Sequence, residues 1–153
     1  FLAAYGDEDL TGVAIEITER GIIDDLDAAA CALAAARAAG ATVALDDFGT
    51  GYSALALVAR LPLDTVKLDA GLVGLAQEST TAQAIIVGLV ELAQRLGLAI
   101  VAEGIETVEQ ARCLLELGVT KGQGFLFSPA VPAAALSTLR DEQRRWATLA
   151  RLD

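Results

Sequence analysis

The sequence predicts an α/β fold with a parallel sheet and, within that class, part of a (β/α)8 barrel. Short apolar runs typical of strands alternate five times with longer runs of helical periodicity. Polar residues also stand at the carboxyl ends of successive strand-like runs, which is where a barrel assembles its site. A doubly wound sheet is the alternative, but it would bring fewer polar groups together from so many strands.

Five strand–helix units are expected in order along the chain. Strands are predicted at 12–17, 42–46, 65–69 and 99–103, with a less regular one within 119–127. Helices are predicted at 24–39, 52–60, 80–96, 107–117 and 132–149. Gly40, Gly97 and Gly118 each follow a helix and precede a strand, as C-terminal stop residues do. Thr107 and Gln110 have the spacing of a capping box, which opens the fourth helix.

The predicted strands divide their side chains by size. In the second strand, Val43 and Leu45 face one way and Ala44 and Asp46 the other, because side chains alternate along a strand. The first and third strands repeat this pattern. We therefore expect large apolar side chains to face the helices. Small side chains, followed by a terminal polar group, should face a crowded barrel interior.

The length of the chain bears on domain organisation. A complete barrel takes eight units and roughly 250 residues, whereas this chain has 153 residues. No linker or low-complexity tract divides the sequence. We therefore expect residues 1–153 to form the carboxyl-terminal portion of one barrel domain.

Composition and charge exclude several functional classes. An apolar fraction of 54% and a charged fraction of 21% are typical of a folded chain rather than a disordered one. The absence of histidine excludes serine–histidine–aspartate triads and histidine-ligated zinc sites. A formal charge of −10 argues against a groove that follows a nucleic-acid backbone, so no polymeric nucleic acid is expected as a partner.

The sequence favours a soluble, cytoplasmic segment. Its longest apolar stretches, 28–36 and 84–90, are shorter than the ~18 residues that a membrane span requires, so no membrane contact is expected from it. A membrane anchor elsewhere in a longer parent protein is compatible with this expectation. Cys31 and Cys113 lie far apart in apolar helical patterns and are predicted to be buried core thiols.

Charged and polar residues converge at the predicted strand ends. They are Glu16, Asp46, Asp47, Lys67, Asp69, Glu103 and Gln123. A single carboxylate in such a place is more often a loop cap or an ion-pair partner than a ligand. Several in one cleft require neutralising cations, and carboxylate oxygens suit Mg²⁺ or Mn²⁺. The adjacent pair Asp46 and Asp47 is suited to hold two ions, as in two-metal phosphoryl chemistry.

Lys67 is one of only two lysines, and it lies in the middle of a predicted strand. It has two interpretations. In the first, it forms a buried ion pair with Asp69 or Asp47. In the second, it is a functional cation that positions or deprotonates an attacking water or contacts a phosphate.

Five segments with these residues stand in order along the chain. They are 16–19 (EITE), 46–53 (DDFGTGYS), 66–69 (VKLD), 102–107 (AEGIET) and 122–125 (GQGF). In order and spacing they resemble the EAL-domain family, whose members are cyclic di-GMP phosphodiesterases on a modified (β/α)8 barrel. The resemblance covers essentially the whole chain. It implies hydrolysis of cyclic di-GMP to linear pGpG with two Mg²⁺ or Mn²⁺ ions.

The resemblance also implies roles for the metal-binding and catalytic residues. Glu16, Asp46 and Asp47 are expected to be metal ligands, with Asp46 as the bridge. Lys67 is expected to hold or activate the nucleophilic water. Glu103 is then a further ligand or a water-orienting group, and Gln123 lies near that water.

Other residues are expected to act around this centre. Asp69 is expected to contact the substrate. Glu19 matches the glutamate that anchors the glycine loop formed by Gly49, Thr50 and Gly51, whose glycines let the backbone bend over the site.

The chain also departs from the family pattern. It contains neither the Glu-Ala-Leu tripeptide nor any asparagine, so two metal ligands of the amino-terminal third are absent. Ala70, Gly71 and Leu72 replace the usual basic residue and aromatic after Asp69, which puts one substrate contact in doubt. We therefore expect an active parent domain but little or no activity from this chain alone.

Two other functional classes are weighed against this one. A catalytically inactive cyclic di-GMP receptor or interaction module would usually lose site carboxylates or the glycine loop, and this chain keeps both. A Schiff-base aldolase or an enolase-like lyase would leave the Asp-Asp-Phe-Gly segment unexplained. Expected partners are cyclic di-GMP, an upstream sensory or GGDEF-type domain and, because apolar helices would be exposed, a second copy of the chain.

Overall fold

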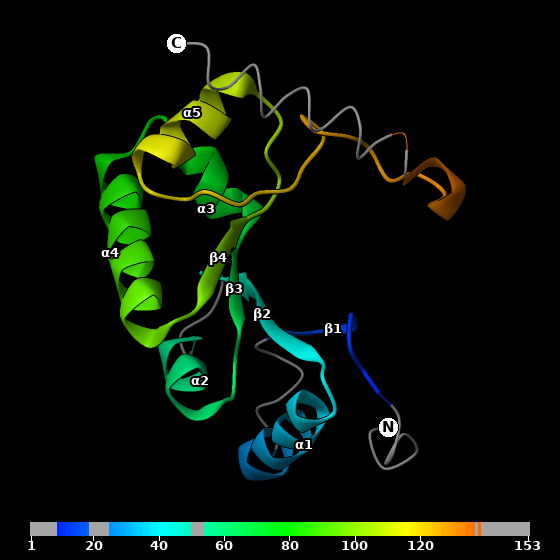
Figure 1. Cartoon of the computed structure of the whole chain (residues 1–153). Helices are drawn as coiled ribbons and strands as arrows, with labels where there is room; N and C mark the ends of the chain where they lie inside the picture. The colour runs from blue at the N-terminus through cyan, green and yellow to red at the C-terminus, as the bar shows by residue number, and fades with distance from the viewer. Residues whose placement is uncertain (1–8, 19–24, 50–53, 137, 139–153) are drawn as a thin grey trace.

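Four parallel strands form one sheet in which neighbours in sequence are neighbours in space (Figure 1). The structure is a computed structural model that describes residues 9–18, 25–49, 54–136 and 138. The strands are β1 (Ala14–Thr18), β2 (Thr42–Phe48), β3 (Thr65–Leu68) and β4 (Ala99–Ala102). Their order is β1-β2-β3-β4 without the reversal of a doubly wound sheet, so the predicted barrel topology is confirmed for this arc.

Helices connect the strands as the periodicity predicts. They are α1 (Leu26–Ala38), α2 (Ala54–Arg60), α3 (Ala70–Leu75), α4 (Thr80–Leu96) and α5 (Val108–Glu116). The predicted bounds of α4 are confirmed, and Thr107 and Gln110 form the expected capping box at the start of α5. Gly40, Gly97 and Gly118 all have positive φ angles, as helix-terminating glycines require.

The core lies between the sheet and the helices in two clusters. The first joins α1 and α2 to the sheet through Leu33, Val43, Leu45, Phe48, Leu57, Leu61, Leu63 and Val66. The second joins α3, α4 and α5 to the sheet through Leu68, Val73, Ala76, Ile86, Val90, Ala102, Ile105, Leu114 and Val119. The expectation that large strand residues face the helices is confirmed for Val43 and Leu45, which are fully buried.

An ion pair ties α1 to the sheet at the edge away from the predicted site. Arg37, in the last turn of α1, donates two hydrogen bonds to the Asp64 carboxylate, at 3.0 and 2.6 Å. The same carboxylate accepts from the Val43 amide at 2.8 Å, at the start of β2. Burial opposes ionisation of Asp64, but these hydrogen bonds and the Arg37 charge outweigh it and lower the pKa of this carboxyl.

Several expectations for the elements are wrong. The strand predicted within 119–127 is reduced to a single bridge between Gly122 and Ala102, because the chain bends and turns from Gly124 onwards. Helix α3 was not predicted, since six residues with two glycines give no helical period. Cys31 is exposed rather than buried, because it lies on the solvent side of α1, and Cys113 is half-buried.

Other predictions fall partly on residues outside the described ones. Of the helix predicted at 132–149, the structure shows a 3-10 helix, η3 (Ala133–Ala135), and most of the rest lies outside the described residues. Among the helices of the described residues, none has the length and apolar character that crossing a membrane demands.

Candidate metal centre

Lys67 forms ion pairs with three carboxylates of the site. It lies in β3 and is the one charged or polar residue among the buried residues that the structure describes, with 6% of its surface exposed. Its Nζ lies 3.0 Å from Glu16 Oε2, 3.1 Å from Asp46 Oδ1 and 2.6 Å from Glu103 Oε1. The buried ion pair that the sequence suggested with Asp69 or Asp47 is therefore formed with three other carboxylates.

The parallel register explains why these residues meet. Thr18 of β1 pairs with Asp46 of β2, so Glu16 lies two residues earlier on the neighbouring strand. Leu68 of β3 pairs with Ala102 of β4, and Glu103 follows directly. Because parallel strands end at the same edge of a sheet, the polar groups at their carboxyl ends come together across four strands.

The three carboxylates keep Lys67 charged. Burial alone would lower the pKa of the Lys67 amine, but hydrogen bonds to Glu103, Glu16 and Asp46 outweigh it and hold the pKa well above its ordinary value. At neutral pH Lys67 is therefore an ammonium ion in this arrangement, which donates hydrogen bonds and cannot accept a proton.

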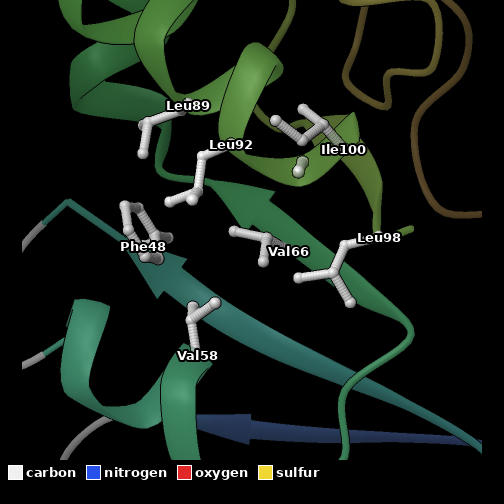
Figure 2. Close-up of a pocket in the computed structure, with 8 residues that line it drawn as sticks. Phe48, Val58, Val66, Leu89, Leu92, Leu98 and Ile100 are labelled. Carbon is white, nitrogen blue, oxygen red and sulfur yellow. The ribbon is translucent and has the colours of Figure 1, made fainter. Parts of the chain in front are cut away.

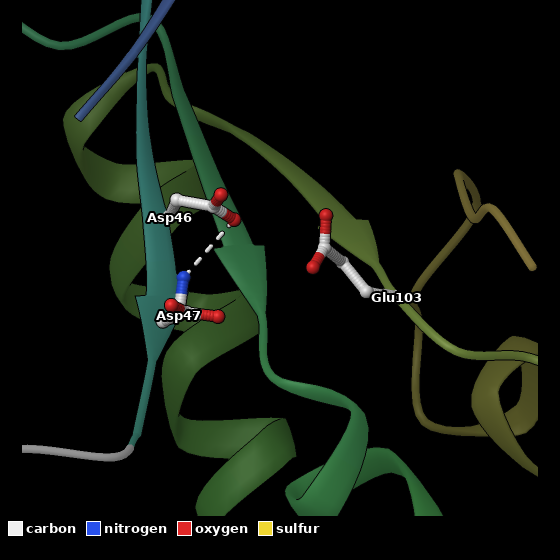
Figure 3. A group of neighbouring side chains, drawn as sticks. All are labelled: Asp46, Asp47 and Glu103. Atoms are coloured by element: carbon white, nitrogen blue, oxygen red, sulfur yellow. Dashed lines mark hydrogen bonds between the residues drawn. The ribbon is translucent and has the colours of Figure 1, made fainter. Parts of the chain in front are cut away.

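Three carboxylates of the site lie close enough to share a cation. Oxygen atoms of Asp46, Asp47 and Glu103 all lie within 4.8 Å of one another. Figure 3 shows the two aspartates of β2 with their carboxylates directed towards Glu103, which follows β4. Carboxylate oxygens suit Mg²⁺, Mn²⁺ and Ca²⁺. The donor set therefore fits the divalent ions that the sequence implies.

Glu16 lies at the margin of this cluster. Its carboxylate pairs with Lys67, and half of its side chain is exposed. The sequence placed Glu16 with Asp46 and Asp47 as metal ligands, whereas Glu103 joins the two aspartates here. The ligand role of Glu16 stays a prediction.

Gln123 lies beside Glu103, and the predicted position of both near one water stays a prediction. Its Nε2 donates to Glu103 Oε1 at 2.8 Å. The backbone holds Gln123 in place, because its amide donates to the Ala102 carbonyl at 2.8 Å and its carbonyl accepts from the Ile105 amide at 3.1 Å. A Cβ at Gly124 would lie 2.2 Å from the Ile105 carbonyl oxygen, so only glycine allows this approach.

The remaining predicted residues surround this centre or lie outside the description. Asp69 caps the N-terminus of α3, where its Oδ1 accepts from the Gly71 amide at 2.8 Å, and its contact with substrate stays a prediction. Gly49 has a φ of 111°, consistent with the bend expected of the glycine loop. Glu19, Thr50 and Gly51 lie outside the described residues, so the anchoring of this loop also stays a prediction.

One feature of the site was not predicted. Asp46 and Asp47 share a face of the sheet although they are adjacent in a strand, and Phe48 is buried on the opposite face. The signal was present in the sequence, since the apolar positions 43, 45 and 48 break the period of two.

The parallel sheet winds in one direction, and a lysine and four carboxylates lie together at its carboxyl edge. These two features define a barrel domain with an acidic site suited to divalent cations. The sequence profile described as EAL domain matches residues 2–130. The chain belongs to the EAL domain family.

Relatives and solved structures agree with this assignment. The chain is 42% identical over 123 residues to the bifunctional diguanylate cyclase/cyclic di-GMP phosphodiesterase MucR of Pseudomonas aeruginosa, covering 80% of this chain and 18% of that protein. The EAL domain of Mycobacterium smegmatis DcpA matches with 38% identity and a TM-score of 0.79 over 85% of this chain and 58% of that chain.

A ligand complex is also similar. The manganese/cy-diGMP complex of Klebsiella pneumoniae BlrP1 matches with 44% identity and a TM-score of 0.72, over 76% of this chain and 30% of that chain. The same protein is also known as a calcium/cy-diGMP complex. The chain spans under a fifth of the length of MucR and between 30% and 58% of these solved chains.

Proposed function

We propose that residues 1–153 are the carboxyl-terminal portion of an EAL-type barrel domain that hydrolyses cyclic di-GMP to linear pGpG. The observation that carries this proposal is the cluster of Asp46, Asp47 and Glu103 beside a buried Lys67. In the reaction, water adds to one phosphorus and the bond from that phosphorus to the ribose 3′ oxygen breaks. The product therefore gains one phosphomonoester and one hydroxyl group.

Glu16, Asp46 and Asp47 are proposed as the residues that would hold two Mg²⁺ or Mn²⁺ ions, with Glu103 as a further ligand or water-orienting group. The proximity of the carboxylates of Asp46, Asp47 and Glu103 supports this assignment, because like charges gathered in one place favour the binding of a cation. When bound, such ions activate water and neutralise the charge that develops on a phosphate. Since the resemblance places further ligands upstream, this chain alone is expected to have little or no activity.

Lys67 and Gln123 are proposed to orient the reacting groups. Lys67 is proposed to hold or activate the nucleophilic water, with Nζ as the group that contacts it. Gln123 donates to Glu103 and fixes the direction of that carboxylate. Asp69 is proposed to contact the substrate at the same edge. Glu19 is proposed to anchor the loop that contains Gly49, Thr50 and Gly51.

The longer protein is proposed to act in the cytoplasm on cyclic di-GMP, under the control of an upstream sensory or GGDEF-type domain. The bifunctional name of the relative MucR supports a cyclase partner in the same chain. Self-association of this chain stays a prediction, to be tested by light scattering on a size-exclusion column.

The test is the formation of pGpG from cyclic di-GMP with Mn²⁺, measured by chromatography. It is run on this chain and on a form extended upstream by about a hundred residues, which would complete a barrel. Each is compared with Lys67→Ala and with the matched control Lys121→Ala, which removes the exposed second lysine.

We expect product from the extended form and its Lys121→Ala variant, and none from Lys67→Ala. Binding of cyclic di-GMP without cleavage by the extended form would instead support the receptor function. Equal product from Lys67→Ala would refute the role proposed for Lys67.

A further inference from the structure

The site depends on a break in the regular pattern of β2. Side chains of a regular strand alternate, so two adjacent aspartates would point to opposite faces of the sheet. Yet oxygens of Asp46 and Asp47 lie within 4.8 Å of each other and of Glu103. An irregularity of the backbone must therefore place both side chains on the same face of the sheet.

That irregularity is a β-bulge. Leu45 pairs with Val66 of β3, and the next pair joins Phe48 to Leu68, so three steps along β2 match two steps along β3. The extra residue lies between Leu45 and Phe48. Asp47 has a φ of 55° and is the one described residue other than glycine with a positive φ. A bulge with one residue in the left-handed region restarts the alternation one position later.

Phe48 fixes where the alternation restarts. Its ring is 6% exposed and packs in the same cluster as Val43 and Leu45. Figure 2 shows the ring between Val58 of α2 and Leu89 and Leu92 of α4, on the helix side of the sheet. The ring and these apolar side chains line a small cavity of about 10 Å³. The ring therefore occupies a buried, apolar place on the helix side of the sheet.

The regular alternative is unfavourable for both residues. Without the bulge, Asp47 would point into the apolar cluster and Phe48 would point among the site carboxylates. A carboxylate among Val58, Leu89 and Leu92 would lose its hydration with no cation in reach. The pairing after the bulge is held by the Phe48 carbonyl, which accepts from the Asp69 amide at 3.3 Å.

We infer that Phe48 is a positioning residue for the candidate metal centre: its burial between α2 and α4 holds the bulge that turns Asp47 towards Asp46 and Glu103. Phe48 touches none of the reacting groups and acts through Asp47. The inference rests on the proposed function, because the proposed function assigns metal binding to the two aspartates.

The test compares Phe48→Ala with the conservative Phe48→Leu and with Leu114→Ala. Leu114 is 2% exposed in the second core cluster, on α5, and serves as a control for loss of core packing alone. The first readout is the backbone conformation of Asp47 without metal, from NMR chemical shifts. The second is the dissociation constant of Mn²⁺, from electron paramagnetic resonance of the free ion.

We expect the left-handed signature of Asp47 to disappear in Phe48→Ala and to persist in Phe48→Leu and Leu114→Ala. The dissociation constant of Mn²⁺ should rise about tenfold in Phe48→Ala alone, as when a group that supports a metal ligand is removed. Phe48→Ala with an unchanged Asp47 conformation would overturn the inference. So would a Leu114→Ala variant that loses Mn²⁺ equally.

A second variant covers the case in which Phe48→Ala does not fold. The double substitution Asp47→Phe with Phe48→Asp keeps the composition and restores regular alternation, so the strand needs no bulge. The two carboxylates would then lie about 6.6 Å apart along the strand. We expect a folded chain that binds Mn²⁺ about tenfold more weakly, and equal affinity would overturn the inference.

Failure of the proposed function is a separate outcome. If the unsubstituted chain and the extended domain bind no Mn²⁺, the metal centre is refuted. The metal-free conformation of Asp47 in the Phe48 variants still decides whether Phe48 holds the bulge.

Discussion

Lys67 Nζ and Glu103 Oε1 lie 2.6 Å apart across the junction of β3 and β4, and the same oxygen accepts from Gln123 Nε2 at 2.8 Å. One carboxylate oxygen thus joins Lys67 of β3 to Gln123, which lies 20 positions after Glu103. Two donors on one oxygen fix its position and balance part of its charge. The other members of the site are arranged about this contact.

Replacing Lys67 by methionine should destabilise the metal-free chain. Three carboxylates would lose the ammonium ion that offsets their negative charges. They are those of Glu16, Asp46 and Glu103. We expect a loss of about 2 kcal/mol in the free energy of unfolding, less than for a fully buried pair because the carboxylates are partly hydrated. Urea unfolding in a chelating buffer measures it. Lys121→Met is the control, and an equal loss in both variants would contradict the prediction.

The Asp64 ion pair should make stability depend on pH in the acid range. Because the folded-state pKa of Asp64 lies below its ordinary value of 3.8, its contribution is present above that pH and is lost as the pH falls through the folded pKa. We expect Asp64→Asn to cost about 1 kcal/mol at pH 7. The difference from the unsubstituted chain should shrink at pH 3 in urea unfolding. A difference that stays constant with pH would argue against this assignment.

The positive φ of Asp47 should restrict the residues that its position accepts. A β-branched side chain is strained at a φ of 55°, whereas asparagine tolerates it. Asp47→Asn and Asp47→Val both remove the charge, so the pair isolates the backbone effect. We expect the valine variant to be about 1–2 kcal/mol less stable than the asparagine variant in urea unfolding. Equal stabilities would show that the bulge relaxes without strain.

A methyl group at Gly124 should disturb the support of Gln123. The added Cβ would lie 2.2 Å from a backbone oxygen of Ile105, which cannot move without breaking its hydrogen bond to Leu126. Gly88, in the middle of α4, is the matched control because nothing lies within 4 Å of a Cβ there.

We expect opposite effects on the melting temperature from these two substitutions. Gly88→Ala should add about 0.5–1 kcal/mol of stability, as alanine does in a helix interior. Gly124→Ala should lower the melting temperature and, in the extended domain, the rate of pGpG formation. A rise in melting temperature for both variants would contradict the close approach of Gly124 to Ile105.

Local patterns in the sequence were sufficient for most elements. Helix α4 was predicted with its bounds because its apolar helical period and its stop at Gly97 agree with each other, and the structure adds a cap at Ser79. Helix α3 had none of these signals. Its six residues are held by the Asp69 cap and by the burial of Val73, which depends on packing.

The membership of the site was also predictable in part. Polar residues at strand ends must converge when the strands are parallel. The residues expected together were Glu16, Asp46, Asp47, Lys67, Asp69, Glu103 and Gln123. The partners of Lys67 were not predicted, because they depend on the relative register of β1 to β4. A shift of one residue in any strand would have turned a different side chain inwards.

The sequence by itself determined the order of βα units, the glycine stops, the acidic character of the site and the family. These follow from periodicity, from residue chemistry and from motif order, which are properties of the chain alone. The tertiary structure decided that Lys67 forms ion pairs with Glu16, Asp46 and Glu103, that Cys31 faces solvent, and that a bulge places Asp47 on the same face as Asp46. Each of these three features depends on which face of a helix or strand is covered by other parts of the chain. The packing of distant segments, such as α2 and α4 around Phe48, decides which face is covered.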